Sequence, residues 1–132
     1  MELGPSLHHL EIWVPRPPQT GDTWDRLLAA LGCAMTQEWQ GGRRYELGAG
    51  YLVLESGPDV RGARHERQAP GVNHVALELS TRAHVDRVVE QLPELGWELL
   101  FSDAHPWAGG PNYYAAYLEN ADGYEVELVA KE

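Results

Sequence analysis

Residues 71–79 read Gly-Val-Asn-His-Val-Ala-Leu-Glu-Leu, and this stretch decides the fold that we expect for the chain. Every second side chain from Val75 to Leu79 is apolar, which is the period of a β-strand with one buried face. His74 then lies on the other face, beside the small side chain of Ala76. His74 could be a structural histidine at the end of a strand, bonded to a neighbouring group, or a functional histidine. A single occurrence of the motif does not decide between these two roles.

The same pattern occurs a second time in the chain. Residues 9–14 read His-Leu-Glu-Ile-Trp-Val and match residues 74–79, histidine for histidine and apolar for apolar, 65 positions earlier. After each copy the sequence predicts a helix and then three short strands, because apolar residues at helical spacing give way to short runs separated by glycine-rich turns. The repeat therefore predicts an α+β fold built from two βαβββ modules.

The module boundaries follow from these elements. The first module covers residues 1–56, residues 57–71 form a linker loop without periodicity, and the second module covers residues 72–132. In the first module we expect strands over 7–14, 34–40, 43–47 and 50–55, and a helix that contains Trp24, Leu27, Leu28 and Leu31. In the second we expect strands over 71–79 and 97–101, a helix with the apolar stripe Val85, Val88, Val89, Leu92 and Leu95, a loop over 102–111, and a hairpin of 112–119 and 124–129.

Composition limits the classes of function. The chain has 132 residues, enough for one domain or two co-folded halves, and a formal net charge of −10, which disfavours nucleic acid and anionic membranes as partners. The single cysteine, Cys33, excludes an intrachain disulfide and a thiolate zinc cluster. No apolar run reaches the roughly 18 residues of a membrane span. We therefore expect a cytoplasmic protein.

Each half also carries a glutamate on its last strand. Glu55 ends the strand over 50–55, and Glu125 and Glu127 lie on one face of the strand over 124–129. Histidine and carboxylate ligands together suit a divalent Fe, Mn, Co, Ni or Zn ion, and two carboxylates would neutralise its charge. A metal site with ligands from both halves is therefore expected.

The chain resembles the vicinal oxygen chelate superfamily, which includes glyoxalase I, bleomycin-resistance proteins, fosfomycin-resistance transferases and extradiol dioxygenases. The resemblance covers nearly the whole chain and rests on residues 7–12, 53–55, 71–77 and 120–129. It implies paired modules whose curled mixed sheets enclose a central cavity, where a metal keeps two positions open for neighbouring oxygens of a substrate. It places the metal ligands on His9, Glu55, His74 and Glu127.

The resemblance also bears on the substrate. Glutathione-using glyoxalases carry an arginine on the first strand where this chain has Trp13, which argues against a glutathione-derived substrate. A larger or more aromatic ligand would suit the aromatic residues better, although core packing is the simpler expectation for most of them. The residues expected to bind substrate are Trp13, His105, Trp107 and Tyr113.

Two classes of function follow from the resemblance. The first is a metal-dependent enzyme of the glyoxalase-like lyase or isomerase type, in which Glu127, or alternatively Glu55, moves a proton. The second is a metal-free protein that binds a drug, as bleomycin-resistance relatives do. The complete ligand set favours the enzyme, and a dioxygenase is a third option in which Glu55 would be a surplus ligand. We also expect a homodimer, because each sheet has an open edge.

Overall fold

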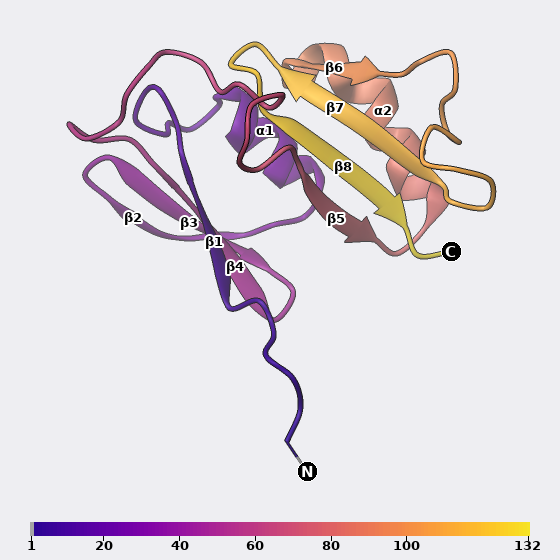
Figure 1. Cartoon of the computed structure of the whole chain (residues 1–132), viewed down its shortest axis with the longest axis horizontal. Coiled ribbons are helices and arrows are strands. Elements are labelled where there is room, and N and C mark those ends of the chain that lie inside the picture. Colours follow the sequence, from indigo (N-terminus) through magenta and orange to yellow (C-terminus); the bar gives the residue numbers. More distant parts are fainter. Residues whose placement is uncertain (1) are drawn as a thin grey trace. The chain divides into compact units, whose positions relative to one another are not determined.

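Both halves of the repeated sequence fold into the same order of elements. The computed structural model describes residues 2–132 and divides the chain into two units, Met1–Ala63 and Arg64–Glu132. Each unit contains one helix and one four-stranded mixed sheet in the order βαβββ (Figure 1). The α+β fold with two similar modules is therefore confirmed.

The first unit is organised around its last strand, β4. The sheet has the order β1-β4-β3-β2, with β1 parallel to β4 and the other pairs antiparallel. The middle of β4 is buried on both faces, which suits its apolar sequence Leu-Val-Leu. The helix starts after Asp22, whose carboxylate accepts a hydrogen bond of 2.9 Å from the backbone N–H of Asp25. The elements are β1 (His9–Trp13), α1 (Thr23–Ala30), β2 (Met35–Trp39), β3 (Gly42–Leu47) and β4 (Gly50–Glu55).

The second unit repeats this plan around β8. Its sheet has the order β5-β8-β7-β6, with β5 parallel to β8, and α2 covers one face of it (Figure 1). The side chain of Thr81 caps the start of α2, and Gly96 ends the helix in the left-handed conformation with φ of 81°. The elements are β5 (Val75–Leu79), α2 (Arg82–Leu95), β6 (Trp97–Leu100), β7 (Ala115–Asn120) and β8 (Glu125–Ala130).

The hairpin strand expected to start at residue 112 is shorter in the structure. It begins only at Ala115 as β7, because Asn112 has φ of 63°, which lies outside the extended region that a strand requires. Residues 112–114 instead continue the loop that precedes β7. This difference matters for the site, since Tyr113 belongs to the loop and not to the sheet.

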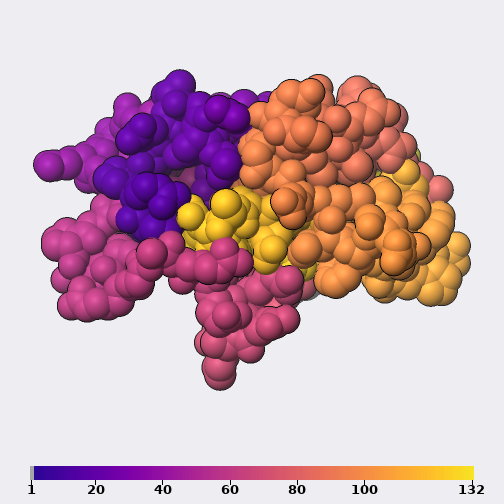
Figure 2. Space-filling model, turned by 90° about the horizontal axis from the view of Figure 1, so that it is seen from above, coloured from indigo at the N-terminus to yellow at the C-terminus, as the bar shows by residue number. Residues whose placement is uncertain are grey.

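A segment at the start of the second unit lies across the β7–β8 turn. The backbone N–H of His65 donates to the carbonyl of Asp122 at 2.8 Å, and Nη1 of Arg64 donates to the carbonyl of Ala121 at 2.6 Å. Rose-coloured atoms of this segment accordingly lie beside yellow atoms of the C-terminal hairpin in Figure 2. Gly123 makes this close approach possible, because a Cβ there would lie 2.3 Å from the carbonyl oxygen of His65.

Replacing Gly123 by alanine is expected to lower the free energy of unfolding by about 2–5 kcal/mol, since strained backbone and a clash with main chain add together. Urea unfolding measures the effect. The matched control is Gly62→Ala, because Gly62 has nearly the same φ of 88° but open space around its Cα. If both variants lose the same amount, contact between His65 and the turn does not constrain Gly123.

Candidate metal and catalytic site

The parallel pair of β5 and β8 brings together two of the predicted site residues. Ala76 lies opposite Glu127 in this pair, so the small side chain leaves room for the glutamate, and His74 reaches it from just before the start of β5. Nε2 of His74 lies 3.0 Å from Oε1 of Glu127. The sequence pattern of a histidine followed two places later by alanine therefore has a direct structural consequence.

Asn73 fixes the orientation of the His74 imidazole. Nδ1 of His74 lies 2.7 Å from Oδ1 of Asn73, whose amide nitrogen donates to the carbonyl of Arg67 at 3.0 Å. Because the amide oxygen can only accept, the network assigns the proton to Nδ1 of His74. The lone pair of Nε2 then points at the carboxylate of Glu127, and a proton or a metal ion is needed between these two atoms.

Glu127 is buried and held from a second side by Tyr113. The Tyr113 hydroxyl donates to Oε2 of Glu127, and this hydrogen bond, together with burial, raises the pKa of Tyr113 to about 12. Tyr113 therefore keeps its proton and stays a donor at ordinary pH. Tyr117 stands opposite Glu127 across the β7–β8 pair, and burial and the nearby charge of Glu127 raise its pKa as well.

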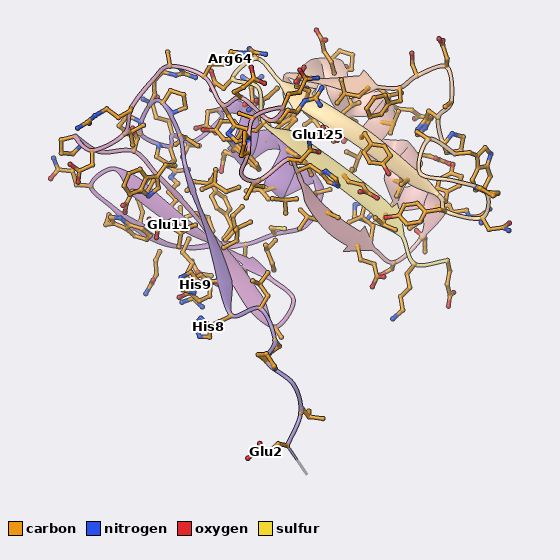
Figure 3. The ribbon with its side chains drawn as sticks, in the orientation of Figure 1. Glu2, His8, His9, Glu11, Arg64 and Glu125 are labelled. Atoms are coloured by element: carbon orange, nitrogen blue, oxygen red, sulfur yellow. The ribbon has the colours of Figure 1, made fainter. Side chains whose placement is uncertain are left out.

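A group of charged residues that sequence reasoning missed lies next to this site. Arg67 donates from Nε to Glu119 at 3.0 Å and approaches Glu125 from Nη1 at 3.1 Å. Glu119 and Glu125 face each other across β7 and β8, so Arg67 compensates two like charges that would otherwise repel. Glu125 is labelled on β8 in Figure 3. No sequence signal pointed to this arginine, because it lies in the segment that was expected to be a linker.

The two predicted ligands of the first unit are not neighbours. His9 lies opposite Tyr51 and stacks on its ring with 4.7 Å between centroids, whereas Glu55 lies opposite Trp13 at the other end of the β1–β4 pair. The four-residue difference in register separates their backbones by about 13 Å, at roughly 3.3 Å per residue. Within residues 2–132, no group of three or more His, Cys, Asp or Glu side chains is close enough to hold a metal ion.

The predicted metal ligands that lie close together are therefore His74 and Glu127 in the second unit. One imidazole nitrogen and one carboxylate oxygen converge there, each with a lone pair available, and the imidazole is held through its other nitrogen. Imidazole nitrogen and carboxylate oxygen are donor types that divalent metals use in proteins, and a hydrogen bond to the second imidazole nitrogen is common in such sites.

Core packing, the simpler expectation for most of the aromatic residues, does not hold for four of them, and substrate binding stays a prediction for Trp13, Trp107 and Tyr113. Trp13, Trp39, Trp107 and Tyr113 are between 38% and 47% exposed. Their positions explain this exposure, because Trp13 and Trp39 lie on a sheet face and Trp107 and Tyr113 lie on the loop before β7. His105 lies on the same loop, where its backbone N–H donates to the carbonyl of Phe101 at 3.0 Å. Among the predicted substrate-binding residues, Tyr113 hydrogen-bonds to the predicted ligand Glu127, and Trp13 lies opposite the predicted ligand Glu55 on the neighbouring strand.

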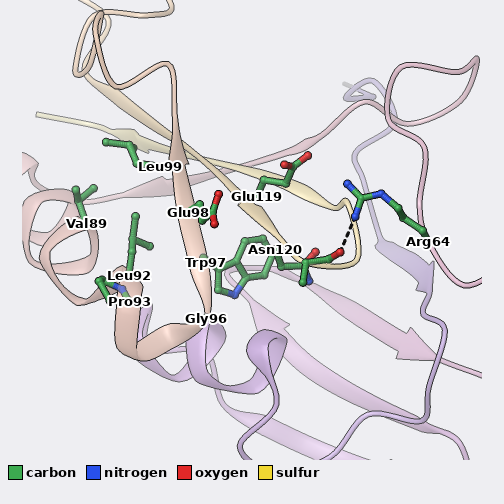
Figure 4. Close-up of a pocket in the computed structure, with 11 residues that line it drawn as sticks. Arg64, Val89, Leu92, Pro93, Gly96, Trp97, Glu98, Leu99, Glu119 and Asn120 are labelled. Atoms are coloured by element: carbon green, nitrogen blue, oxygen red, sulfur yellow. Dashed lines mark hydrogen bonds between the residues drawn. The ribbon is translucent and has the colours of Figure 1, made fainter.

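A pocket of about 740 Å³ opens elsewhere in the second unit. It is lined by the end of α2, β6 and the β7–β8 turn, with Leu92, Trp97 and Glu119 among its walls (Figure 4). None of the predicted site residues lines it, so it is not the cavity expected around His74 and Glu127.

Comparisons with known proteins agree with this architecture. No protein-family model matches the chain. It is 32% identical over 125 residues to the uncharacterized protein YqjT of Bacillus subtilis (strain 168), covering 94% of this chain and 98% of YqjT. A crystal structure of a candidate glyoxalase from Bacillus halodurans has a TM-score of 0.83 and 38% identity, with 94% of each chain covered.

A more distant structure shares the fold. It is a variant of the fosfomycin resistance protein FosX from Listeria monocytogenes, complexed with Mn(II) and 1S,2S-dihydroxypropylphosphonic acid. Its TM-score is 0.66 at 16% identity, and the match covers 98% of this chain and 93% of FosX. The 38% identity to the candidate glyoxalase, over 94% of each chain, shows that the chain belongs to the vicinal oxygen chelate superfamily, and the more distant structures share its fold. Among residues 2–132, no helix is both long enough and apolar enough to cross a membrane.

Proposed function

We propose that the protein is a divalent-metal-dependent enzyme of the glyoxalase-like lyase or isomerase type, acting on a small molecule with neighbouring oxygens. The observation that carries this proposal is the arrangement of Asn73, His74 and Glu127. Asn73 holds the Nδ1 proton of His74, so that Nε2 and Oε1 of Glu127 face each other at 3.0 Å. A fold relative that binds Mn(II) together with a dihydroxy compound supports the same chemistry.

In this proposal His74 and Glu127 hold the ion. When bound, the metal would polarise neighbouring oxygens of the substrate. His9 and Glu55 remain predicted ligands from the resemblance, although their separation in register means that they are not a preformed pair within the first unit.

Glu127 is the proposed base. Its Oε2 is held by the hydroxyl of Tyr113, which leaves Oε1 to take a proton from the carbon next to a substrate carbonyl. Oε1 would release the ion as it takes this proton, whereas His74 would keep its Nε2 lone pair on the metal. Glu55, whose Oε1 accepts from Trp39, is the weaker candidate for this role.

Replacing Asn73 by alanine tests the proposed site without removing a ligand. We expect Mn²⁺ affinity to fall about 10- to 100-fold, because loss of the outer hydrogen bond frees the imidazole to rotate and to change tautomer. Asn73→Asp should restore most of the affinity, since a carboxylate also accepts from Nδ1–H.

The measurement is calorimetric titration of Mn²⁺ into metal-stripped protein, and Gln40→Ala on the surface of the first unit is the control. Unchanged affinity in Asn73→Ala would rule out His74 as an oriented ligand. A drop in both Asn73 variants would indicate a structural role for Asn73 alone.

The homodimer expected from the sequence remains a prediction. The edge strands opposite the parallel pairs are β2 in the first unit and β6 in the second. Both have one unpaired side in the described part of the chain, which is where pairing with a second copy would be expected.

A further inference from the structure

Four residues form a row across the sheet of the first unit, remote in register from His9. Trp13 on β1 lies opposite Glu55 on β4, Glu55 lies opposite Gly42 on β3, and Gly42 lies opposite Trp39 on β2. Residues that are opposite one another in neighbouring strands point to the same face of a sheet. Glu55 therefore stands between two tryptophans on one face.

The missing side chain of Gly42 lets Trp39 lie flat toward Glu55. A Cβ on Gly42 would be only 2.4 Å from Cε2 and Nε1 of the Trp39 indole. The indole N–H donates to Oε1 of Glu55 at 2.8 Å. On the other side, the N–H of Trp13 donates to Oε2 of Glu11 at 2.6 Å. Each tryptophan is thus anchored through its N–H to a carboxylate.

Both tryptophans nevertheless keep a large accessible surface. Trp13 is 47% exposed and Trp39 is 39% exposed. A tryptophan that is exposed and held by a hydrogen bond contributes little to core packing but suits a binding surface. Its side chain is already in one rotamer, so binding a ligand costs little further conformational entropy. Glu11, which is labelled in Figure 3, lies two residues before Trp13 on β1 and therefore on the same face of the sheet.

The charge on this face is unbalanced. In the part of the chain that the structure describes, neither Glu11 nor Glu55 forms an ion pair with a cationic side chain. Arg44 lies on the same face, but its guanidinium pairs with Glu46 at 2.7 Å and stacks over Tyr51 at 3.7 Å. The carboxylates of Glu11 and Glu55, which lie beside the two indole rings, therefore have no cationic side chain that balances their charge among the described residues.

We propose that Trp13, Glu55 and Trp39, with Glu11 beside them, form a binding site for an alkylammonium group of a small organic molecule. The indole faces would attract the cation through their quadrupoles, and the carboxylates would supply the opposite charge. The apolar ring surface suits methyl or methylene groups around the nitrogen, which a metal ion lacks. The site is an alternative to the metal-ligand role predicted for Glu55, and it does not involve His74 or Glu127.

The experiment uses choline as the probe and neohexanol, its uncharged carbon isostere, as the matched control ligand. The indole N–H signals of ¹⁵N-labelled, chelator-treated protein are assigned with Trp13→Phe and Trp39→Phe variants. Choline is expected to shift the signals of Trp13 and Trp39 saturably, and neohexanol is expected to leave them in place.

Two variants make the result specific. Glu55→Gln keeps an oxygen for the Trp39 N–H but removes the charge, and it should weaken choline binding about three- to fivefold. Trp39→Leu should weaken it about three- to tenfold. Glu78→Gln, on exposed β5 of the second unit, should bind choline like the parent.

Three results would overturn the proposal. They are equal shifts with both ligands, unchanged choline affinity in Glu55→Gln, and the absence of any saturable shift. Selective broadening of the same two signals by Mn²⁺, without a response to choline, would instead make Glu55 a metal ligand. Failure at this site would leave the proposed function intact, because the Asn73 variants report on the second unit alone.

Discussion

Glutamine in place of Glu127 is expected to lower turnover about 10²- to 10⁴-fold, the usual contribution of a positioned general base. The amide oxygen can still accept from Tyr113, so the packing around the buried side chain is retained. Much of the Mn²⁺ affinity should also remain, since His74 is unchanged and still presents the lone pair of Nε2. The loss should therefore appear in kcat more than in metal content.

The assay uses metal-loaded protein with small molecules that carry adjacent oxygens, such as hemithioacetals of 2-oxoaldehydes and 2-hydroxy ketones. Glu55→Gln is the matched comparison and should be milder, because Glu55 lies on the exposed face of the first unit and contacts Trp39. Equal turnover in Glu127→Gln and the parent would exclude Glu127 as the base. If neither variant lowered turnover while metal removal abolished activity, polarisation of the substrate by the metal would account for catalysis without a glutamate base.

Alanine in place of His74 is expected to lower Mn²⁺ affinity by at least about 100-fold, beyond the effect of losing an outer hydrogen bond alone. The variant removes the only imidazole that faces Glu127 among the described residues and leaves a buried carboxylate without that partner. Calorimetric titration measures the loss.

His84→Ala is the control for this variant. It deletes a half-buried imidazole from the first turn of α2 in the same unit and should bind Mn²⁺ like the parent. Comparable losses in both variants would mean that Mn²⁺ binds histidines non-specifically. His9→Ala, measured in the same series, tests whether the first unit adds a ligand.

The repeat in the sequence predicted the order of elements in both units because it depends on local signals. Alternation around His74, the helical stripe from Val85 to Leu92 and the Asn120–Gly123 turn each act over a few residues. The turn also has its own hydrogen bonds, since Oδ1 of Asn120 accepts from Tyr124 N at 3.1 Å. Such features can be read without knowing which strands pair.

The register of parallel strands could not be predicted in this way. His9 and Glu55 take similar positions in the sequence to His74 and Glu127, but only the second pair meets. A long crossover separates the partners of a parallel pair, so no turn fixes their register. The roles of Asn73 and Arg67 were missed for a related reason, because their partners lie in other segments of the chain.

The aromatic residues show a further limit of sequence reasoning. Tryptophan is a residue type expected in the core, yet Trp13 and Trp39 each lie on an exposed sheet face with the indole N–H bonded to a carboxylate. Which face of a strand is covered depends on the packing of whole elements. Hydropathy alone therefore misplaced them.

Electron paramagnetic resonance titration of metal-stripped protein with Mn²⁺ tests directly whether the protein binds a divalent ion. We expect saturable binding of about one ion per chain, accompanied by a rise in the unfolding temperature, because an ion that binds only the folded state stabilises it. Protein that binds no Mn²⁺, and whose unfolding temperature does not change with Mn, Fe, Co, Ni or Zn, would contradict this expectation.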